Sequence, residues 1–97
     1  MSNAIEAFKI KNDSNVHSTA TALSKYLLEN GADKVEVQAV GAGAVNQAYK
    51  ILVETRAKLS REGKDLLTKC GMRSVEGKKE GDEGKAISIA VISFYIR

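Results

Sequence analysis

The change of hydrophobic period within residues 35–52 constrains the fold more than any other feature of this chain. Apolar and polar residues alternate over residues 35–40, which predicts a strand with Val35, Val37 and Ala39 on one face. Gly-Ala-Gly-Ala follows, and its glycines allow a sharp turn and a close approach to another surface. The apolar period then becomes helical, at Ala44, Ala48, Ile51, Leu52, Thr55 and Leu59. The segment therefore predicts a strand that turns directly into an amphipathic helix, which begins just after Gly43.

The rest of the chain predicts three more strands and one more helix. Strands are predicted over residues 7–12, 64–75 and 86–96, and Gly71 is interpreted as a bulge in the second of these. The strand over 86–96 is apolar almost throughout, which predicts a central position in the sheet. The additional helix runs from residue 16 to the stop signal Asn30-Gly31, and its apolar stripe is Val16, Ala20, Leu23 and Leu27. The order β-α-β-α-β-β predicts an α/β fold of the α+β two-layer sandwich type, with two helices packed on one face of a mixed four-stranded sheet.

Chain length and composition limit the class of protein. The 97 residues predict a single domain, 1–97, with an open functional surface instead of an enclosed chamber. Ser2-Asn3-Ala4 is interpreted as a tag remnant, so no function is assigned to residues 1–5. No apolar run long enough to span a membrane and no secretory signal is visible, which favours a cytoplasmic protein with no membrane partner. Cys70 has no cysteine partner within the chain and is interpreted as a small buried strand residue.

The positive charge is concentrated in the middle of the chain. Residues 50–73 hold seven basic and three acidic side chains, whereas residues 1–49 hold four and five, and residues 74–97 hold four of each. The basic residues are Lys50, Arg56, Lys58, Arg61, Lys64, Lys69 and Arg73. A concentrated basic stripe is typical of nucleic-acid-binding proteins, although helix faces are also made basic for solubility alone.

The octapeptide over residues 41–48, Gly-Ala-Gly-Ala-Val-Asn-Gln-Ala, resembles the signature of the bacterial stage V sporulation protein S family, within the Alba superfamily. The resemblance includes the preceding Val-Gln-Ala-Val and the following Lys50, and the order of elements fits over roughly residues 7–96. It implies an Alba-like domain in a small dimeric regulatory protein, and the superfamily implies nucleic-acid binding.

Four residues at the strand-to-helix junction are candidates for contact with nucleic acid. The start of the helix near Gly41 and Gly43 can hold a phosphate on its free backbone N–H groups, although this is not a P-loop. Asn46 and Gln47 carry amides that can bond to phosphates or base edges. In the alternative interpretation the glycines only permit close helix-sheet packing, and the amides contact a second copy of the chain or solvent.

Further candidates follow from the superfamily resemblance. Related proteins place basic residues after the first strand, where this chain has Lys11 and His17. The predicted hairpin loop over residues 77–85 offers Lys78, Lys79 and Lys85, but four acidic side chains lie among or beside them. The archaeal chromatin branch has a basic residue where Gly43 stands, so this chain departs from that pattern. Together with Lys50, Arg56 and Arg61 from the basic segment, these residues complete the predicted nucleic-acid surface.

Nothing in the sequence indicates an enzyme. The single histidine and single cysteine form no nucleophile-base pair, and His17 has no second ligand at metal-binding spacing, so we expect neither a metal nor a cofactor. The five aromatic residues are interpreted as core and interface residues that do not form a paired stacking platform. The sequence therefore predicts a cytoplasmic, dimeric regulator that binds DNA or RNA. The alternative is a protein-interaction or self-assembly module in a regulatory pathway that does not bind nucleic acid directly.

Overall fold

The computed structural model describes residues 5–76 and 86–97 and contains the predicted order of elements. The strands are β1 (Glu6–Ile10), β2 (Val35–Ala39), β3 (Leu66–Glu76) and β4 (Ala86–Ile96). The helices are α1 (Val16–Asn30) and α2 (Ala42–Ser60), and a 3-10 turn, η1 (Ala32–Lys34), precedes β2. The bounds of β4 are those that its apolar run predicts.

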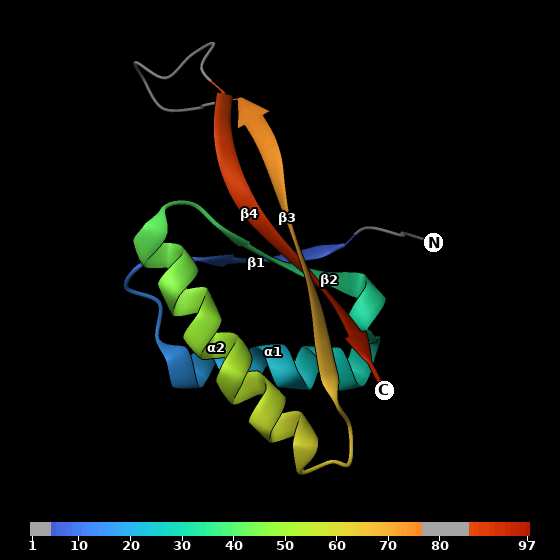
Figure 1. The fold of residues 1–97 in the computed structure, drawn as a ribbon. Coiled ribbons are helices and arrows are strands. Elements are labelled where there is room, and N and C mark those ends of the chain that lie inside the picture. The colour runs from blue at the N-terminus through green and yellow to red at the C-terminus, as the bar shows by residue number, and fades with distance from the viewer. Residues whose placement is uncertain (1–4, 77–85) are drawn as a thin grey trace.

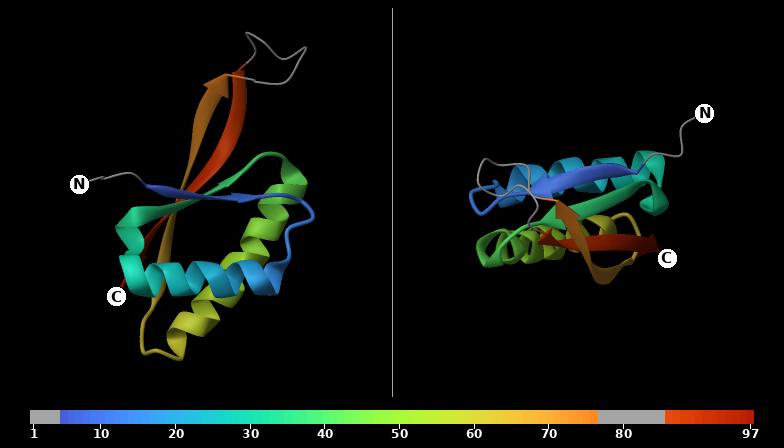
Figure 2. Two further views of the ribbon diagram at one scale, coloured as in Figure 1. Left: turned by 180° about the vertical axis from the view of Figure 1, so that it is seen from behind. Right: turned by 90° about the horizontal axis from the view of Figure 1, so that it is seen from above.

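The four strands form one mixed sheet in the order β1-β2-β4-β3. β1 and β2 are parallel, whereas β4 is antiparallel to both of its neighbours, β2 and β3. Both helices lie on the same side of this sheet and leave its other side uncovered, as Figure 1 and Figure 2 show. The predicted two-layer architecture and the central position of β4 are therefore confirmed.

The core lies between the helices and one face of the sheet. Val35, Val37 and Ala39 of β2 are buried there, as the alternation predicts. The helices contribute Ala20, Leu23 and Leu27 from α1 and Ala44, Ala48, Ile51, Thr55 and Leu59 from α2. Ile10 of β1, Leu66 of β3, and Ile92 and Phe94 of β4 complete the same cluster. The helical periods thus identified the buried stripes of both helices, with Val16 and Leu52 half-buried at their margins.

Local polar groups and glycines fix where the helices begin and end. The side chain of Asn15 accepts a hydrogen bond from the Ser18 N–H at 2.8 Å, which caps α1. Gly31, at φ 98°, donates its N–H to the carbonyl of Leu27 and ends the helix. Gly41, at φ 90°, makes the turn from β2 into α2, a backbone conformation that favours glycine.

Three predicted boundaries and one predicted bulge differ from the structure. β1 ends at Ile10 because Lys11 enters a turn, in which its N–H donates to Ser14 Oγ at 2.8 Å. Helix α2 begins at Ala42, ahead of the predicted position, because Gly41 alone makes the turn. β3 runs over Leu66–Glu76 and pairs continuously with β4, so Gly71 is not a bulge. The predicted hairpin loop, with Lys78, Lys79 and Lys85, lies outside the described residues.

Burial of one side chain was also predicted incorrectly. Cys70 is exposed because it lies on the edge strand β3, beyond the cover that the helices give. Among the aromatic residues, which were predicted to be core and interface residues, Tyr49 and Tyr95 are 69% and 56% exposed, so for these two only the interface prediction remains. The core interpretation holds for the remaining aromatic residues. Phe94 is buried, and the rings of Phe8 and Tyr26 meet edge to face at 5.9 Å.

Candidate nucleic-acid interface

The loop between β1 and α1 packs against the first turns of α2. A Cβ atom placed on Gly43 would lie 2.9 Å from the Cβ of Asn12, so the loop approaches the helix as closely as a glycine allows. Two residues farther along the same loop, the carbonyl of Ser14 accepts a hydrogen bond from Gln47 Nε2 at 2.8 Å. Figure 2 shows this loop beside the start of α2. Two predicted sites that are 30 residues apart in the sequence therefore form one surface.

The start of α2 presents free backbone donors on this surface. The first helical hydrogen bond in this turn runs from the Val45 N–H to the carbonyl of Gly41 at 3.0 Å. The N–H groups of residues 42–44 precede it and have no partner within the helix. No side chain caps this end, and Gly41, Ala42 and Gly43 are exposed. An anion can therefore approach these N–H groups, where the helix dipole adds a favourable term.

One side of α2 continues this surface toward the other end of the helix. Helical spacing places Lys50, Glu54 and Arg61 on the same side, about three turns apart from first to last. Glu54 Oε2 lies 2.9 Å from His17 Nδ1, so this side of α2 faces the first turn of α1. We call this region the loop-helix surface and define it by six exposed residues: Lys11, His17, Gly41, Gly43, Asn46 and Lys50.

Gln47 differs from the other predicted residues of this region. It is half-buried, and its amide N–H₂ group is engaged with Ser14. Its role in this chain is to hold the loop against α2, whereas Asn46 beside it is exposed. The sequence does not distinguish these two neighbouring amides, but in the structure one is bonded to the loop and the other is exposed.

The remaining basic residues of the segment 50–73 do not form one stripe. Arg56 points away from Lys50 and donates from Nε to Asp65 Oδ1 at 3.2 Å. Lys69 and Arg73 lie on the face of the sheet opposite the helices, which we call the open face. The structure therefore divides the concentrated charge between the sides of α2 and the open face.

Arg73 is held on the open face by an ion pair with Glu36. Its Nη1 and Nη2 atoms donate to the two carboxylate oxygens of Glu36 at 3.1 and 3.2 Å. Gln38 Nε2 donates to the same carboxylate at 2.6 Å. These hydrogen bonds, with Arg73 as the main cause, hold the pKa of Glu36 below its ordinary value, although burial acts in the opposite direction. The carboxylate therefore stays charged although its side chain is only 10% exposed.

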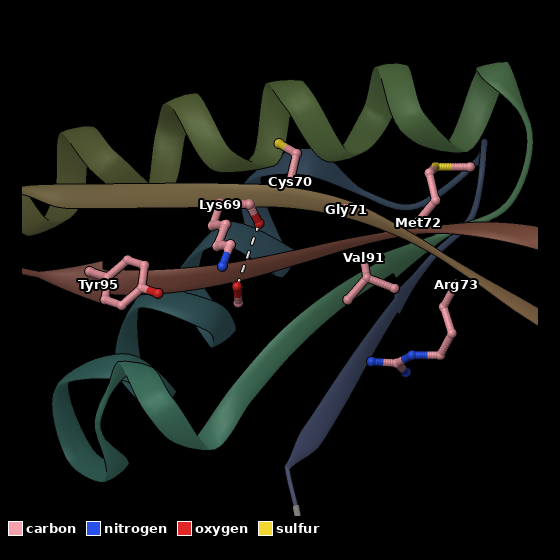
Figure 3. A pocket seen from close by; sticks show the side chains of 8 residues that line it. Lys69, Cys70, Gly71, Met72, Arg73, Val91 and Tyr95 are labelled. Carbon is pink, nitrogen blue, oxygen red and sulfur yellow. Dashed lines mark hydrogen bonds between the residues drawn. The ribbon is translucent and has the colours of Figure 1, made fainter.

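A row of exposed apolar side chains follows another side of α2. Val45, Tyr49 and Val53 recur every four residues and are 43%, 69% and 55% exposed. Met72 of β3 is 70% exposed and points toward α2, as Figure 3 shows. We call these four residues the apolar stripe. Their spacing is visible in the sequence, but their exposure depends on the absence of a neighbouring element on that side.

Two other kinds of site were sought among the described residues. Over residues 5–76 and 86–97, His, Cys, Asp and Glu side chains form no group of three that could hold a metal ion. Neither α1 nor α2, the two long helices of that part of the chain, is apolar enough over a sufficient length to cross a membrane.

Comparisons with known proteins identify the family and the fold of this chain. The family model described as stage V sporulation protein S matches residues 6–93. Among solved structures, the chain is similar to Alba from Thermoplasma volcanium, with a TM-score of 0.59 and 13% sequence identity over 92% of this chain and 98% of that one. At this identity the structural likeness shows a shared fold, whereas the family match covers most of the chain.

Proposed function

The chain belongs to the stage V sporulation protein S family, and on that premise we propose that it is a regulatory protein that binds nucleic acid as a dimer and catalyses no reaction. The Alba-like fold supports nucleic-acid binding through the superfamily resemblance. The observation that carries the proposal is the loop-helix surface, where an uncapped helix start lies beside Lys11 and Lys50.

The loop-helix surface suits the phosphate backbone better than it suits base edges. Backbone N–H groups at a helix start and lysine ammonium groups bind phosphate without regard to sequence. Arg61 extends the positive charge along the same side of α2. With only a few cations in each subunit, one copy would bind weakly, and a second copy would double the number of phosphate contacts.

The apolar stripe supports the dimer. Large apolar side chains grouped on one face of a small protein are typical of a surface that another protein covers. The stripe and the loop-helix surface lie on adjacent sides of α2, so a second copy that covers the stripe would lie next to Lys50 without having to cover it. We propose a cytoplasmic homodimer joined through Val45, Tyr49, Val53 and Met72.

The same stripe favours a second candidate function. If a different protein covers the stripe, the chain is a protein-interaction module and its nucleic-acid surface is not needed. Such a module would bind its partner with little dependence on salt, because the stripe is uncharged.

Titration into labelled duplex DNA and structured RNA tests the proposal. Fluorescence anisotropy at about 50 and 200 mM salt should show affinity falling by up to roughly 100-fold if four lysines of a dimer contact phosphates. Lys11→Ala and Lys50→Ala should each weaken binding and reduce the salt dependence, because each removes a phosphate contact. Lys25→Ala is the matched control, since Lys25 is an exposed lysine of α1 next to Glu29 and Glu62.

Three outcomes separate the two candidate functions. Loss of affinity in Lys11→Ala and Lys50→Ala, with Lys25→Ala unchanged, supports the loop-helix surface. Equal losses in all three variants would mean that binding follows net charge alone. No binding to either nucleic acid, with the dimer intact, would reject the regulator and favour the protein-interaction module.

A further inference from the structure

The open face of the sheet carries polar and aromatic side chains that the loop-helix surface does not use. Strand register places Lys9, Gln38, Val91 and Gly71 in one row across the four strands on this face. Lys69, Arg73 and Tyr95 lie on the same face along β3 and β4. The helices cover the opposite side, so nothing among the described residues lies over this face.

Gly71 leaves a shallow depression in the middle of the open face. A Cβ atom at this position would meet no atom within 4 Å, so the space above the strand is open. The depression has a volume of about 240 Å³, and its walls include Lys69, Arg73, Val91 and Tyr95. This is below the roughly 300–1,000 Å³ of pockets that enclose small molecules, so it suits a ring laid on a surface.

Planar groups stand at both ends of this depression. The ring of Tyr95 is 56% exposed at one end. At the other end, the ion pair with Glu36 fixes the guanidinium plane of Arg73, which is 51% exposed. Figure 3 shows these two side chains at opposite ends with Lys69 between them, while Cys70 and Met72 point to the other side of the sheet. Tyrosine rings and arginine guanidinium planes are the groups on which unpaired bases stack.

We propose that the open face around Gly71 binds a short stretch of single-stranded nucleic acid. Tyr95 and Arg73 stack against unpaired bases, and Lys69 and Lys9 contact the phosphates between them. Glu36 is a positioning residue, because it touches no ligand and holds the guanidinium in its plane. Arg73 lies opposite Ile89, which is six residue steps from Tyr95 along β4, roughly 20 Å of extended strand. This span fits two or three bases laid along a sheet.

The chemistry of this face favours single strands over a duplex. Bases inside a duplex are stacked on each other, so an exposed aromatic ring gains nothing from them. Glu36 also neutralises Arg73, which leaves Lys9 and Lys69 as the unpaired cations among the described residues of this face. The proposal extends nucleic-acid binding to a second surface with its own residues, so the two surfaces can be tested independently.

Two variants test the site without removing core residues. Gly71→Val fills the depression with a residue that strands favour, and its Cβ atom meets no atom within 4 Å. Tyr95→Ala removes one stacking ring and should weaken binding of a six-nucleotide single strand by roughly 5- to 150-fold, the range for one stacked base. Leu28→Ala is the control, because Leu28 is an exposed residue of α1 that lies away from the open face and from the apolar stripe. RNA and DNA hexamers are compared in parallel.

Tryptophan fluorescence provides a second test, which does not depend on a change in binding affinity. The chain has no tryptophan, so Tyr95→Trp introduces a single reporter that retains a stacking ring. Its fluorescence should be quenched when a single strand binds, whereas that of Leu28→Trp should not change. Glu36→Gln should weaken binding of the hexamer and leave binding of duplex unchanged.

Each result has a defined meaning. Hexamer binding that Gly71→Val and Tyr95→Ala reduce, and Leu28→Ala does not, supports the site. Hexamer binding unaffected by Gly71→Val and Tyr95→Ala overturns it. Absence of hexamer binding, while duplex binding through Lys11 and Lys50 persists, overturns this inference alone. Absence of both kinds of binding overturns the proposed function as well.

Discussion

Arg73 on β3 reaches across β4 and pairs with Glu36 on β2, with both carboxylate oxygens accepting hydrogen bonds at 3.1 and 3.2 Å. The pair therefore joins two strands that are not neighbours in the sheet. A carboxylate with 10% of its side chain exposed is costly to keep charged unless hydrogen bonds compensate, and Arg73 and Gln38 supply them. The ion pair between Arg73 and Glu36 therefore also stabilises the sheet.

This pair predicts a dependence of stability on pH. The pKa of Glu36 lies below its ordinary value of 4.5 in the folded chain, so the unfolded chain takes up the proton first as pH falls. The stabilising contribution is therefore complete above about pH 4.5 and is lost as pH falls through the folded pKa. Glu36→Gln should cost about 1–2 kcal/mol at pH 7, and the difference from the native protein should shrink in acid.

Urea denaturation of both proteins at several pH values from 7 to 3 measures this difference. Glu62→Gln serves as the control, because Glu62 is exposed and should show a small effect. A difference between the native protein and Glu36→Gln that stayed constant down to pH 3 would contradict the prediction.

Features that depend on local period could be predicted from the sequence. The apolar run over residues 86–96 gave both ends of β4, because β-branched and aromatic residues continue to its last position. The stop signal Asn30-Gly31 predicted the end of α1, because a helix cap depends on groups within four residues of it. The fold class follows from the order of such elements.

Features that depend on strand order could not be predicted in the same way. The ion pair of Glu36 with Arg73 spans 37 residues and exists because β4 inserts between β2 and β3. The contact of Asn12 with Gly43 likewise depends on how the loop folds over α2. Cys70 was predicted to be buried, but it is exposed because the helices cover β3 at Leu66 and not farther along the strand. Local patterns thus predict which residues share a face, and tertiary packing decides which face is covered.

Gly43 provides a second prediction. An alanine in place of a helical glycine normally stabilises a protein by about 1 kcal/mol, because glycine loses more backbone entropy on folding. Here the new Cβ would lie 2.9 Å from the Cβ of Asn12, so the loop must move. Gly43→Ala should therefore destabilise the protein, by about 1–3 kcal/mol, as overpacking does. It should also weaken duplex binding if the loop-helix surface is the site.

Replacing Asn12 identifies the cause of that loss. Asn12→Gly removes the Cβ atom of residue 12, with which the new Cβ atom of Gly43→Ala would clash. In the double variant, the alanine should therefore be neutral or stabilising. Thermal or urea unfolding of the four proteins gives the interaction energy directly. Additive effects of the two substitutions would show that the close approach of loop and helix is not what requires glycine.

The apolar stripe provides the last prediction. Val53 is 55% exposed in one copy of the chain, so Val53→Asp should fold normally as a monomer. In a dimer joined through the stripe, the same carboxylate would be buried without a partner in each subunit, and that cost should shift the equilibrium to monomers. Sedimentation equilibrium should give twice the chain mass for the native protein and the chain mass for Val53→Asp. Leu28→Asp is the matched control, because Leu28 is 43% exposed on α1, away from the stripe. If Val53→Asp remained dimeric, the subunits would have to meet through another surface, and the open face would then have to be tested for burial by the second copy.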